Sequence, residues 1–305
     1  MSLQNLKVHY ESNKIDYDSL IKSTRIAGEY TDNAVLDIVV PNYHRDSYCA
    51  TTIKHLISSL EYLDTPLRYN LIIMSFNESK LLESLALEND LVYLCCAEFP
   101  TIHDNEFSRA FSFNLPYNYL KLSSKWIMCH DSDLLVDDQF MLNILESMEE
   151  SKTWVQPYNG KRVSNLNKED TDKLLSGHNL TLSSLEVSYP QAGAPGGSIL
   201  VPTDLFKQVG GYDPELFWGY GPEDSMFWVK LEHMFSHFDS IPKCHVGNAL
   251  YSENTTVYHL SHPPSYTNKD YSKFKVIHDS FFRLTHEDRT ELLKFKKNLY
   301  DNGYV

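Results

Sequence analysis

Short β-branched runs that alternate with amphipathic stretches are the feature that most limits how this chain can fold. The apolar runs have the length of strands and occupy residues 35–40, 70–74, 91–95 and 126–130. Between the first two runs, Ile53, Leu56 and Leu60 recur at helical spacing, and similar stretches follow the later runs. This alternation predicts an α/β fold with a mostly parallel central sheet flanked by helices.

The pattern also suggests how the chain is divided. We expect an N-terminal extension over residues 1–30, a main domain over residues 31–270 and a C-terminal helical segment over residues 271–305. Residues 157–190 are polar and weakly periodic, so we expect a loop or small insertion there.

Charge and composition restrict the partners and the compartment. The formal net charge of −14 disfavours a nucleic-acid partner, because the field of the protein repels phosphate. No run approaches the roughly 18 apolar residues of a membrane span, so no transmembrane segment is expected. The five cysteines are odd in number and form no CxxC, which favours reduced thiols and a cytoplasmic location. A peripheral position on the inner membrane face stays open.

Two carboxylates follow the fourth predicted strand, at Asp131 and Asp133. Ligands of open α/β sheets bind at the carboxyl ends of strands. Alternate residues of an extended segment point the same way, so both carboxylates could hold one Mg²⁺ or Mn²⁺ ion. The alternative is an acidic turn that caps the next helix.

A second acidic pair, Glu223 and Asp224, comes after an aromatic loop interrupted by glycines. Exposed Trp218 or Tyr220 would offer a flat face to a sugar ring. Pro222 followed by two acids is also ordinary chemistry for the start of a helix. That simpler explanation accounts for the acids but not for the aromatic residues and glycines before them.

Basic side chains could complete such a site. His259 follows a predicted strand and would serve Mn²⁺ as a third ligand, although a histidine beside a strand is more often structural. A zinc site on His259 and His262 is disfavoured, since HExxH spacing and a cysteine partner are missing. Arg45 and Arg109 are either clamps for a diphosphate or ordinary surface charges.

Several motifs in order along the chain resemble those of GT-A glycosyltransferases, which transfer a sugar from a nucleotide-sugar donor. The likeness is closest to the β-1,4-galactosyltransferase and chondroitin-polymerase branch and extends over about residues 35–270. The motifs that carry it are Gly196-Gly197-Ser198, Gly210-Gly211-Tyr212, Trp218 to Asp224, Phe107 to Ala110 with Asn114, and Tyr258-His259 with Pro263-Pro264. Pro222 stands where these relatives have a glycine, and Ser75 to Glu78 stand where many have an acidic turn.

The resemblance implies a role for each matching residue. It implies metal ligands at Asp131, Asp133 and His259, with Asp131 also holding the ribose or a metal-bound water. It implies donor contacts at Pro41, Tyr43, Arg45, Arg109, Asp131, Gly196 and Gly197. Trp218, Tyr220 and Glu223 would bind the acceptor, and Asp224 would be the catalytic base.

The implied activity is the transfer of a sugar from a nucleotide-diphosphate sugar, with a UDP-sugar expected, to a saccharide or glycoconjugate hydroxyl. The resemblance implies Mn²⁺ or Mg²⁺ dependence and inversion at the anomeric carbon. A retaining GT-A enzyme and a non-catalytic carbohydrate-binding protein are the alternatives. An NAD-dependent dehydrogenase fits the strand–helix alternation but lacks G-x-G-x-x-G after the first strand, where Pro41 to Arg45 stand.

Overall fold

The computed structural model describes most of the chain. The described residues are 1–15, 24–62, 67–98, 107–119, 123–150, 154–158, 163–191, 196–219, 221–235, 255–263 and 271–302.

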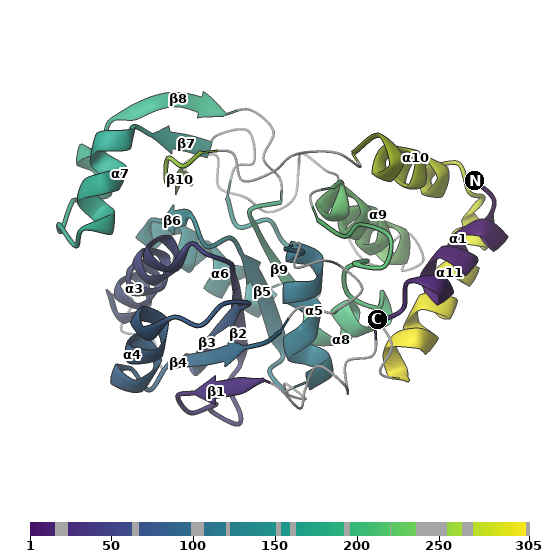
Figure 1. The fold of residues 1–305 in the computed structure, drawn as a ribbon, viewed down its shortest axis with the longest axis horizontal. Coiled ribbons are helices and arrows are strands. Elements are labelled where there is room, and N and C mark those ends of the chain that lie inside the picture. The colour runs from purple at the N-terminus through teal and green to yellow at the C-terminus, as the bar shows by residue number, and fades with distance from the viewer. Residues whose placement is uncertain are drawn as a thin grey trace.

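A six-stranded sheet forms the centre of the protein, in the order β1-β4-β3-β2-β5-β9 (Figure 1). Its strands are β1 (Arg25–Ala27), β2 (Leu36–Asn42), β3 (Tyr69–Ser75), β4 (Val92–Cys96), β5 (Trp126–His130) and β9 (Ser198–Pro202). The four middle strands are parallel, whereas β1 and β9 pair antiparallel at the two edges. The predicted α/β fold with a mostly parallel sheet is confirmed.

Helices cover both faces of this sheet because its strands are apolar on both sides. On β2, Ile38 and Val40 belong to one core cluster and Val39 to the other, as the alternation of strand side chains requires. The first face carries α3 (Asp46–Tyr62), α4 (Lys80–Glu88) and α6 (Asp138–Glu150). The second carries α5 (Arg109–Tyr119), α8 (Thr203–Gln208) and α9 (Glu223–Phe235).

A smaller sheet lies beyond the end of β5, in the order β6-β10-β7-β8. Its strands are β6 (Leu134–Val136), β10 (Val257–His259), β7 (Val163–Leu166) and β8 (Val187–Gln191). The helix α7 (Lys168–Leu175) and the 3₁₀ turn η2 (Leu182–Ser184) connect β7 to β8. Residues 163–191 therefore contain strands and a helix where a long loop was one expectation, and a small insertion over residues 157–190 stays a prediction. Strands this short and a helix with only Thr171 buried leave little periodicity in the sequence.

Three further helices pack on the outer side of α9: α1 (Leu3–Ser12), α10 (Tyr271–Phe282) and α11 (His286–Asp301). Thr285 caps α11 by accepting a hydrogen bond from the Asp288 amide. Leu6 and Tyr10 of α1 are buried, so this helix packs into the core. Among the described helices, none combines the length and apolar character needed to cross a bilayer.

A buried group of charges joins α1, α9 and α11 to the loop after α8. Lys230 donates to Asp213 over 2.9 Å and to the Gly211 carbonyl over 2.5 Å, and Tyr10 donates to Asp213 over 2.7 Å. Lys296 forms an ion pair with Glu215. Burial lowers the pKa of Lys230 to about 8, although the Asp213 charge opposes this. The loop that leads to Trp218 is thus anchored by charges that must remain paired.

Replacement of Lys230 by methionine should lower the free energy of unfolding by roughly 3–5 kcal/mol, because it leaves a buried carboxylate without its main partner. Tyr10→Phe removes one hydrogen bond to the same carboxylate and should cost about 1.5–3 kcal/mol. The matched control is Lys297→Met on an exposed pair with Asp301, for which less than about 1 kcal/mol is expected. Urea unfolding measures all three, and equal losses for Lys230→Met and Lys297→Met would contradict the buried network.

Candidate active site

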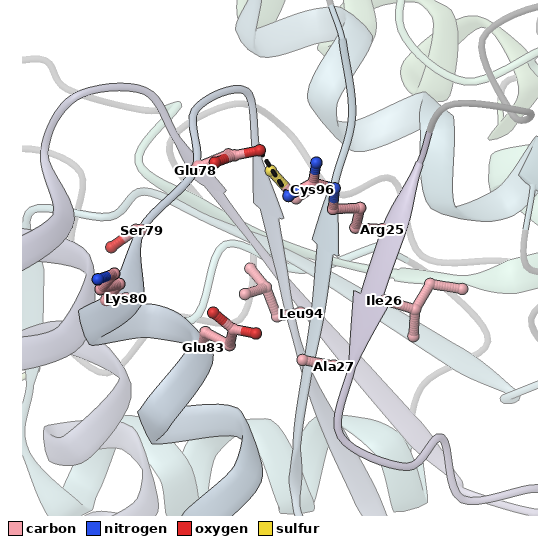
Figure 2. A pocket seen from close by; sticks show the side chains of 9 residues that line it. All are labelled: Arg25, Ile26, Ala27, Glu78, Ser79, Lys80, Glu83, Leu94 and Cys96. Atoms are coloured by element: carbon pink, nitrogen blue, oxygen red, sulfur yellow. Dashed lines mark ion pairs between the residues drawn. The ribbon is translucent and has the colours of Figure 1, made fainter.

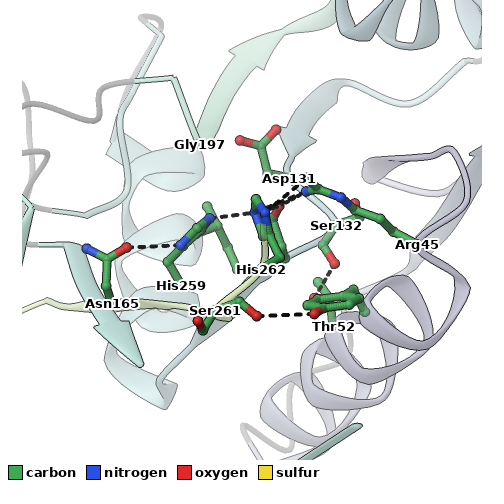
Figure 3. A network of polar contacts seen from close by, with 12 residues as sticks. Arg45, Thr52, Asp131, Ser132, Asn165, Gly197, His259, Ser261 and His262 are labelled. Carbon is green, nitrogen blue, oxygen red and sulfur yellow. Dashed lines mark hydrogen bonds and ion pairs between the residues drawn. The ribbon is translucent and has the colours of Figure 1, made fainter. Parts of the chain in front are cut away.

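The turn that contains Asp131 and Asp133 lies where the two sheets meet. The Asp131 amide donates to the Gly197 carbonyl over 2.9 Å, and the Leu260 amide donates to the Asp133 carbonyl over 2.9 Å. The chain turns here and does not continue extended, so the two carboxylates contact different partners. Asp131 contacts Arg109, whereas Asp133 contacts Arg45. Figure 3 shows Asp131 pointing away from the histidines, and one ion shared by both carboxylates stays a prediction.

Asp133 forms a group suited to a metal ion with His259 and His262. Ligand atoms of these three residues all lie within 4.8 Å of one another. Asp133 Oδ1 is 3.8 Å from His259 Nε2, and Asp133 Oδ2 is 3.1 Å from His262 Nε2. A carboxylate and two imidazoles are a ligand set that Mn²⁺ accepts. Asp131 is not one of the three ligands in this arrangement.

The far ring nitrogens of both histidines face oxygen acceptors. His259 Nδ1 lies 3.0 Å from Asn165 Oδ1, and His262 Nδ1 lies 2.8 Å from the Pro263 carbonyl. Since the Asn165 oxygen can only accept, His259 Nδ1 is assigned the proton and its Nε2 keeps the lone pair. A carbonyl partner of this kind fixes the ring and the tautomer of a metal-binding histidine. The Nε2 lone pair of His259 is therefore available beside Asp133.

The protonation states of Asp133 and His259 also favour binding of a cation. Burial alone would raise the pKa of Asp133. The close contact with His262 and the charge of Arg45 outweigh burial and lower the pKa of Asp133 to about 2. Burial lowers the pKa of His259, which keeps its imidazole neutral. Metal ligands must be deprotonated carboxylates and neutral imidazoles, and Asp133 and His259 meet this requirement.

Arg109 organises a second group around Asp224. Its guanidinium contacts Asp131 through Nε, Asp224 through one terminal nitrogen and the Gly196 carbonyl through the other. Glu223 Oε1 lies 3.9 Å from the same arginine, whose guanidinium carbon lies 4.8 Å from the centre of the Phe113 ring. The family resemblance implies that Arg109 contacts the donor near its diphosphate. In the structure it links Asp131 to the predicted base.

The paired glycines before β9 leave room for this arrangement. A Cβ atom on Gly196 would stand 1.8 Å from Asp224 Oδ2, which no side chain could tolerate without displacing the carboxylate. The Gly197 amide donates to the Tyr158 hydroxyl over 3.1 Å. Because β9 pairs antiparallel with β5, with Ser198 opposite His130, both glycines come to lie beside Asp131.

Two other carboxyl groups of the site have raised pKa values. Burial, together with the charges of Asp133 and Asp224, raises the pKa of Asp131 to about 7 despite its contact with Arg109. Burial and the Asp224 charge raise the pKa of Glu223 to about 8. Glu223 accepts a hydrogen bond from the Gly221 amide over 3.1 Å, which holds its side chain at the start of α9.

Among the remaining residues predicted to contact donor or acceptor, the side chain of Trp218 is less exposed than that role suggests. Trp218 is only 8% exposed, with its ring 5.2 Å from that of Phe111, so its role as an acceptor platform stays a prediction. Tyr220 lies outside the described residues. Pro41 is in β2, and Tyr43 follows it, stacked on Phe107 with ring centres 5.8 Å apart.

Sequence reasoning missed two residues of the metal group. His262 was considered only as a zinc ligand, although its spacing of three residues from His259 was visible. Asn165 lies within residues 157–190, where the weak periodicity predicts a loop or small insertion and so gives no sign of a strand. In the structure β7 pairs parallel with β10 and places Asn165 opposite His259.

A separate pocket lies at the β1 edge of the central sheet (Figure 2). Ile26, Ala27 and Leu94 line it together with the exposed ion pair of Arg25 and Glu78, whose charged atoms are 2.6 Å apart. It contains none of the predicted site residues, and we assign it no role in the chemistry.

Comparison with known families supplies independent information on the second half of the site. Residues 178–260 match a family model described as the N-terminal domain of galactosyltransferase. The matched segment contains Gly196, Gly197, Asp224 and His259. Over the residues that it covers, the match agrees with the family resemblance that the ordered motifs carry. No curated protein sequence matches the chain.

Solved structures with similar folds include two glycosyltransferases and a protein in complex with a nucleotide sugar. The catalytic domain of Drosophila β1,4-galactosyltransferase 7, in complex with xylobiose, is 17% identical over 80% of this chain and 79% of its own, with a TM-score of 0.48. S. aureus TarS 1–349 with UDP-GlcNAc is 13% identical over 87% and 72%, with a TM-score of 0.48. The Pyrobaculum calidifontis mannosyltransferase PcManGT with GDP-Man and Mn²⁺ is 12% identical over 99% and 86%, with a TM-score of 0.47. Scores this low do not establish a shared site.

Loss of the Asn165 carbonyl should weaken the metal group without touching its ligands. Asn165→Ala should raise the dissociation constant for Mn²⁺ by roughly 10–100-fold, because His259 loses the acceptor that fixes its tautomer. Asn165→Asp keeps an oxygen acceptor and is the matched control, with affinity expected near that of the parent protein. Calorimetric titration with MnCl₂ measures the constants. Unchanged affinity in Asn165→Ala would show that His259 needs no such partner or does not bind the metal.

Proposed function

We propose that the protein is a metal-dependent, inverting glycosyltransferase that moves a sugar from a nucleotide-diphosphate sugar to a saccharide hydroxyl. The observation that carries the proposal is the contact between two groups of different chemistry. The Asp133 group suits a divalent cation, and the Asp224 group suits a base. Arg109 and the Asp131–Asp133 turn connect them within one site.

Asp133, His259 and His262 would hold the cation, with Mn²⁺ as the first expectation and Mg²⁺ as the second. The bound ion would supply positive charge that stabilises the diphosphate as it leaves. This assignment replaces Asp131 by His262 in the predicted ligand set. Asp131 then serves the donor side of the site through its contact with Arg109.

Asp224 would accept the proton of the attacking hydroxyl. A bond forms between the acceptor oxygen and the anomeric carbon, and the bond from that carbon to the phosphate oxygen breaks. The proton moves to the Asp224 carboxylate, which Arg109 holds in place and Gly196 leaves room for. Inversion follows because the acceptor oxygen attacks in a single displacement, on the face opposite the leaving group.

The donor and acceptor would lie on opposite sides of this carboxylate. Donor contacts are proposed for Pro41, Tyr43, Arg45, Gly196 and Gly197, at the ends of β2 and the start of β9. A UDP-sugar is the proposed donor, on the family resemblance and the galactosyltransferase match. Glu223, with Trp218 and Tyr220 of the preceding loop, is proposed to contact the acceptor.

Asp224→Asn should retain donor binding and lose transfer by about 10²–10⁴-fold, which is what a general base contributes. Asparagine keeps the shape and the hydrogen-bond acceptor for Arg109 but cannot take a proton. The matched control is Asp204→Asn, which removes an exposed carboxylate on α8 and should leave transfer unchanged. Nucleotide-sugar binding is followed by thermal shift and transfer by product formation. Near-normal transfer in Asp224→Asn would remove this residue from the role of base.

The stereochemistry of the product tests the single-displacement mechanism. ¹H NMR of a reaction started with an α-linked UDP-sugar should show a product whose anomeric proton has the large coupling of a β linkage. An α-linked product would indicate a retaining enzyme. Binding of saccharides without transfer or donor hydrolysis in the presence of Mn²⁺ would favour a carbohydrate-binding protein.

A further inference from the structure

Arg45 lies inside the metal group. One terminal guanidinium nitrogen is 2.5 Å from Asp133 Oδ2 and 3.1 Å from His262 Nε2, and the other is 3.1 Å from His262 Nδ1. Figure 3 shows the guanidinium next to His262, at the end of a row that begins at Asn165 and passes through His259. The arginine thus contacts one carboxylate oxygen and one ring nitrogen that a cation would use.

Arginine and a metal ion cannot share these atoms. A neutral imidazole has one lone pair in its plane, so His262 Nε2 can accept from Arg45 or bind a cation, but not both. The guanidinium cannot lose its proton in a protein. A divalent ion beside it would face a positive charge at close range in a largely buried place, where only 22% of the Arg45 side chain is exposed.

The backbone around Arg45 is held, so only its side chain can leave. The Cys49 amide donates to the Arg45 carbonyl over 2.9 Å at the start of α3, and the His44 amide donates to Asn77 Oδ1 over 2.8 Å. Asp46 accepts from Asn42 and Asn77 over 2.9 and 3.0 Å. A change of side-chain rotamer would take the guanidinium away from Asp133 and leave the loop in place.

We propose that Arg45 is a built-in counter-cation for Asp133, which neutralises the carboxylate before metal binds and is displaced when the ion arrives. This rests on the proposed function, since it assumes that Asp133, His259 and His262 bind the metal. The arginine makes binding of the metal weaker than the three ligands alone would give. Once displaced, its fork is free to contact another anion, such as a phosphate oxygen.

An arginine that only stabilises the fold would behave differently. Loss of a structural ion pair would leave metal affinity unchanged or weaken it by disordering Asp133. Loss of a competing cation must instead tighten metal binding, because the ion no longer has to displace it. The sign of the change in affinity therefore separates the two roles without any measurement of transfer.

The test is calorimetric titration of the full chain with MnCl₂ alone. Arg45→Gln should lower the dissociation constant at least fivefold relative to the parent protein, and Arg45→Met should do the same. Arg25→Gln is the matched control for charge, since Arg25 is 76% exposed and pairs with Glu78 away from the site. Its affinity should equal that of the parent. Thermal melting of each variant verifies that it is folded.

Two results separate this inference from the proposed function. If Asp133→Ala binds Mn²⁺ as well as the parent protein, the metal site itself is misassigned and the inference fails with it. If Asp133→Ala abolishes binding but Arg45→Gln and Arg45→Met bind Mn²⁺ with parental or weaker affinity, the metal site stands and the counter-cation role is overturned.

Discussion

Compensation of the Asp133 charge is the constraint on which the site depends. The side chain of Asp133 is only 11% exposed, and a carboxylate that is removed from water needs cationic partners or hydrogen-bond donors. Arg45 and two histidines surround it, and each comes from a segment distant in sequence. A buried carboxylate beside two imidazoles is a place where a divalent ion could take over from Arg45 as the charge partner of the carboxylate. The acidic turn therefore acts as more than the cap of a helix.

The position of this turn follows from the way the two sheets are joined. β5 ends at His130 in the central sheet, and β6 begins at Leu134 in the smaller one, so Asp131 and Asp133 occupy the connection. β10 pairs antiparallel with β6 and sets His259 opposite Leu134. β9 pairs antiparallel with β5 and brings Gly196 and Gly197 to the same edge. The smaller sheet and the central sheet thus each supply one half of the site.

The sequence predicted the elements with strong periodicity and the residues next to them. The four parallel strands, Asp131, Asp133 and the start of α9 at Glu223 were placed correctly because apolar runs and helix-start residues are local signals. The sequence could not predict that Asp131 pairs with Arg109 while Asp133 pairs with Arg45. This difference depends on a turn that is fixed by backbone hydrogen bonds with Gly197 and Leu260. Asn165 could not be found either, because its role arises from pairing of two short strands that are far apart in sequence.

The direct test of the central claim is anomalous diffraction from crystals soaked in MnCl₂. The account predicts one ion bound by an Asp133 oxygen and by Nε2 of His259 and of His262, each about 2.0–2.3 Å away, as is usual for divalent transition-metal ligands. In the same map Arg45 should have left Asp133, and Asp131 should remain with Arg109. An ion that is bound by Asp131 and not by the two histidines, or by neither aspartate, would contradict it.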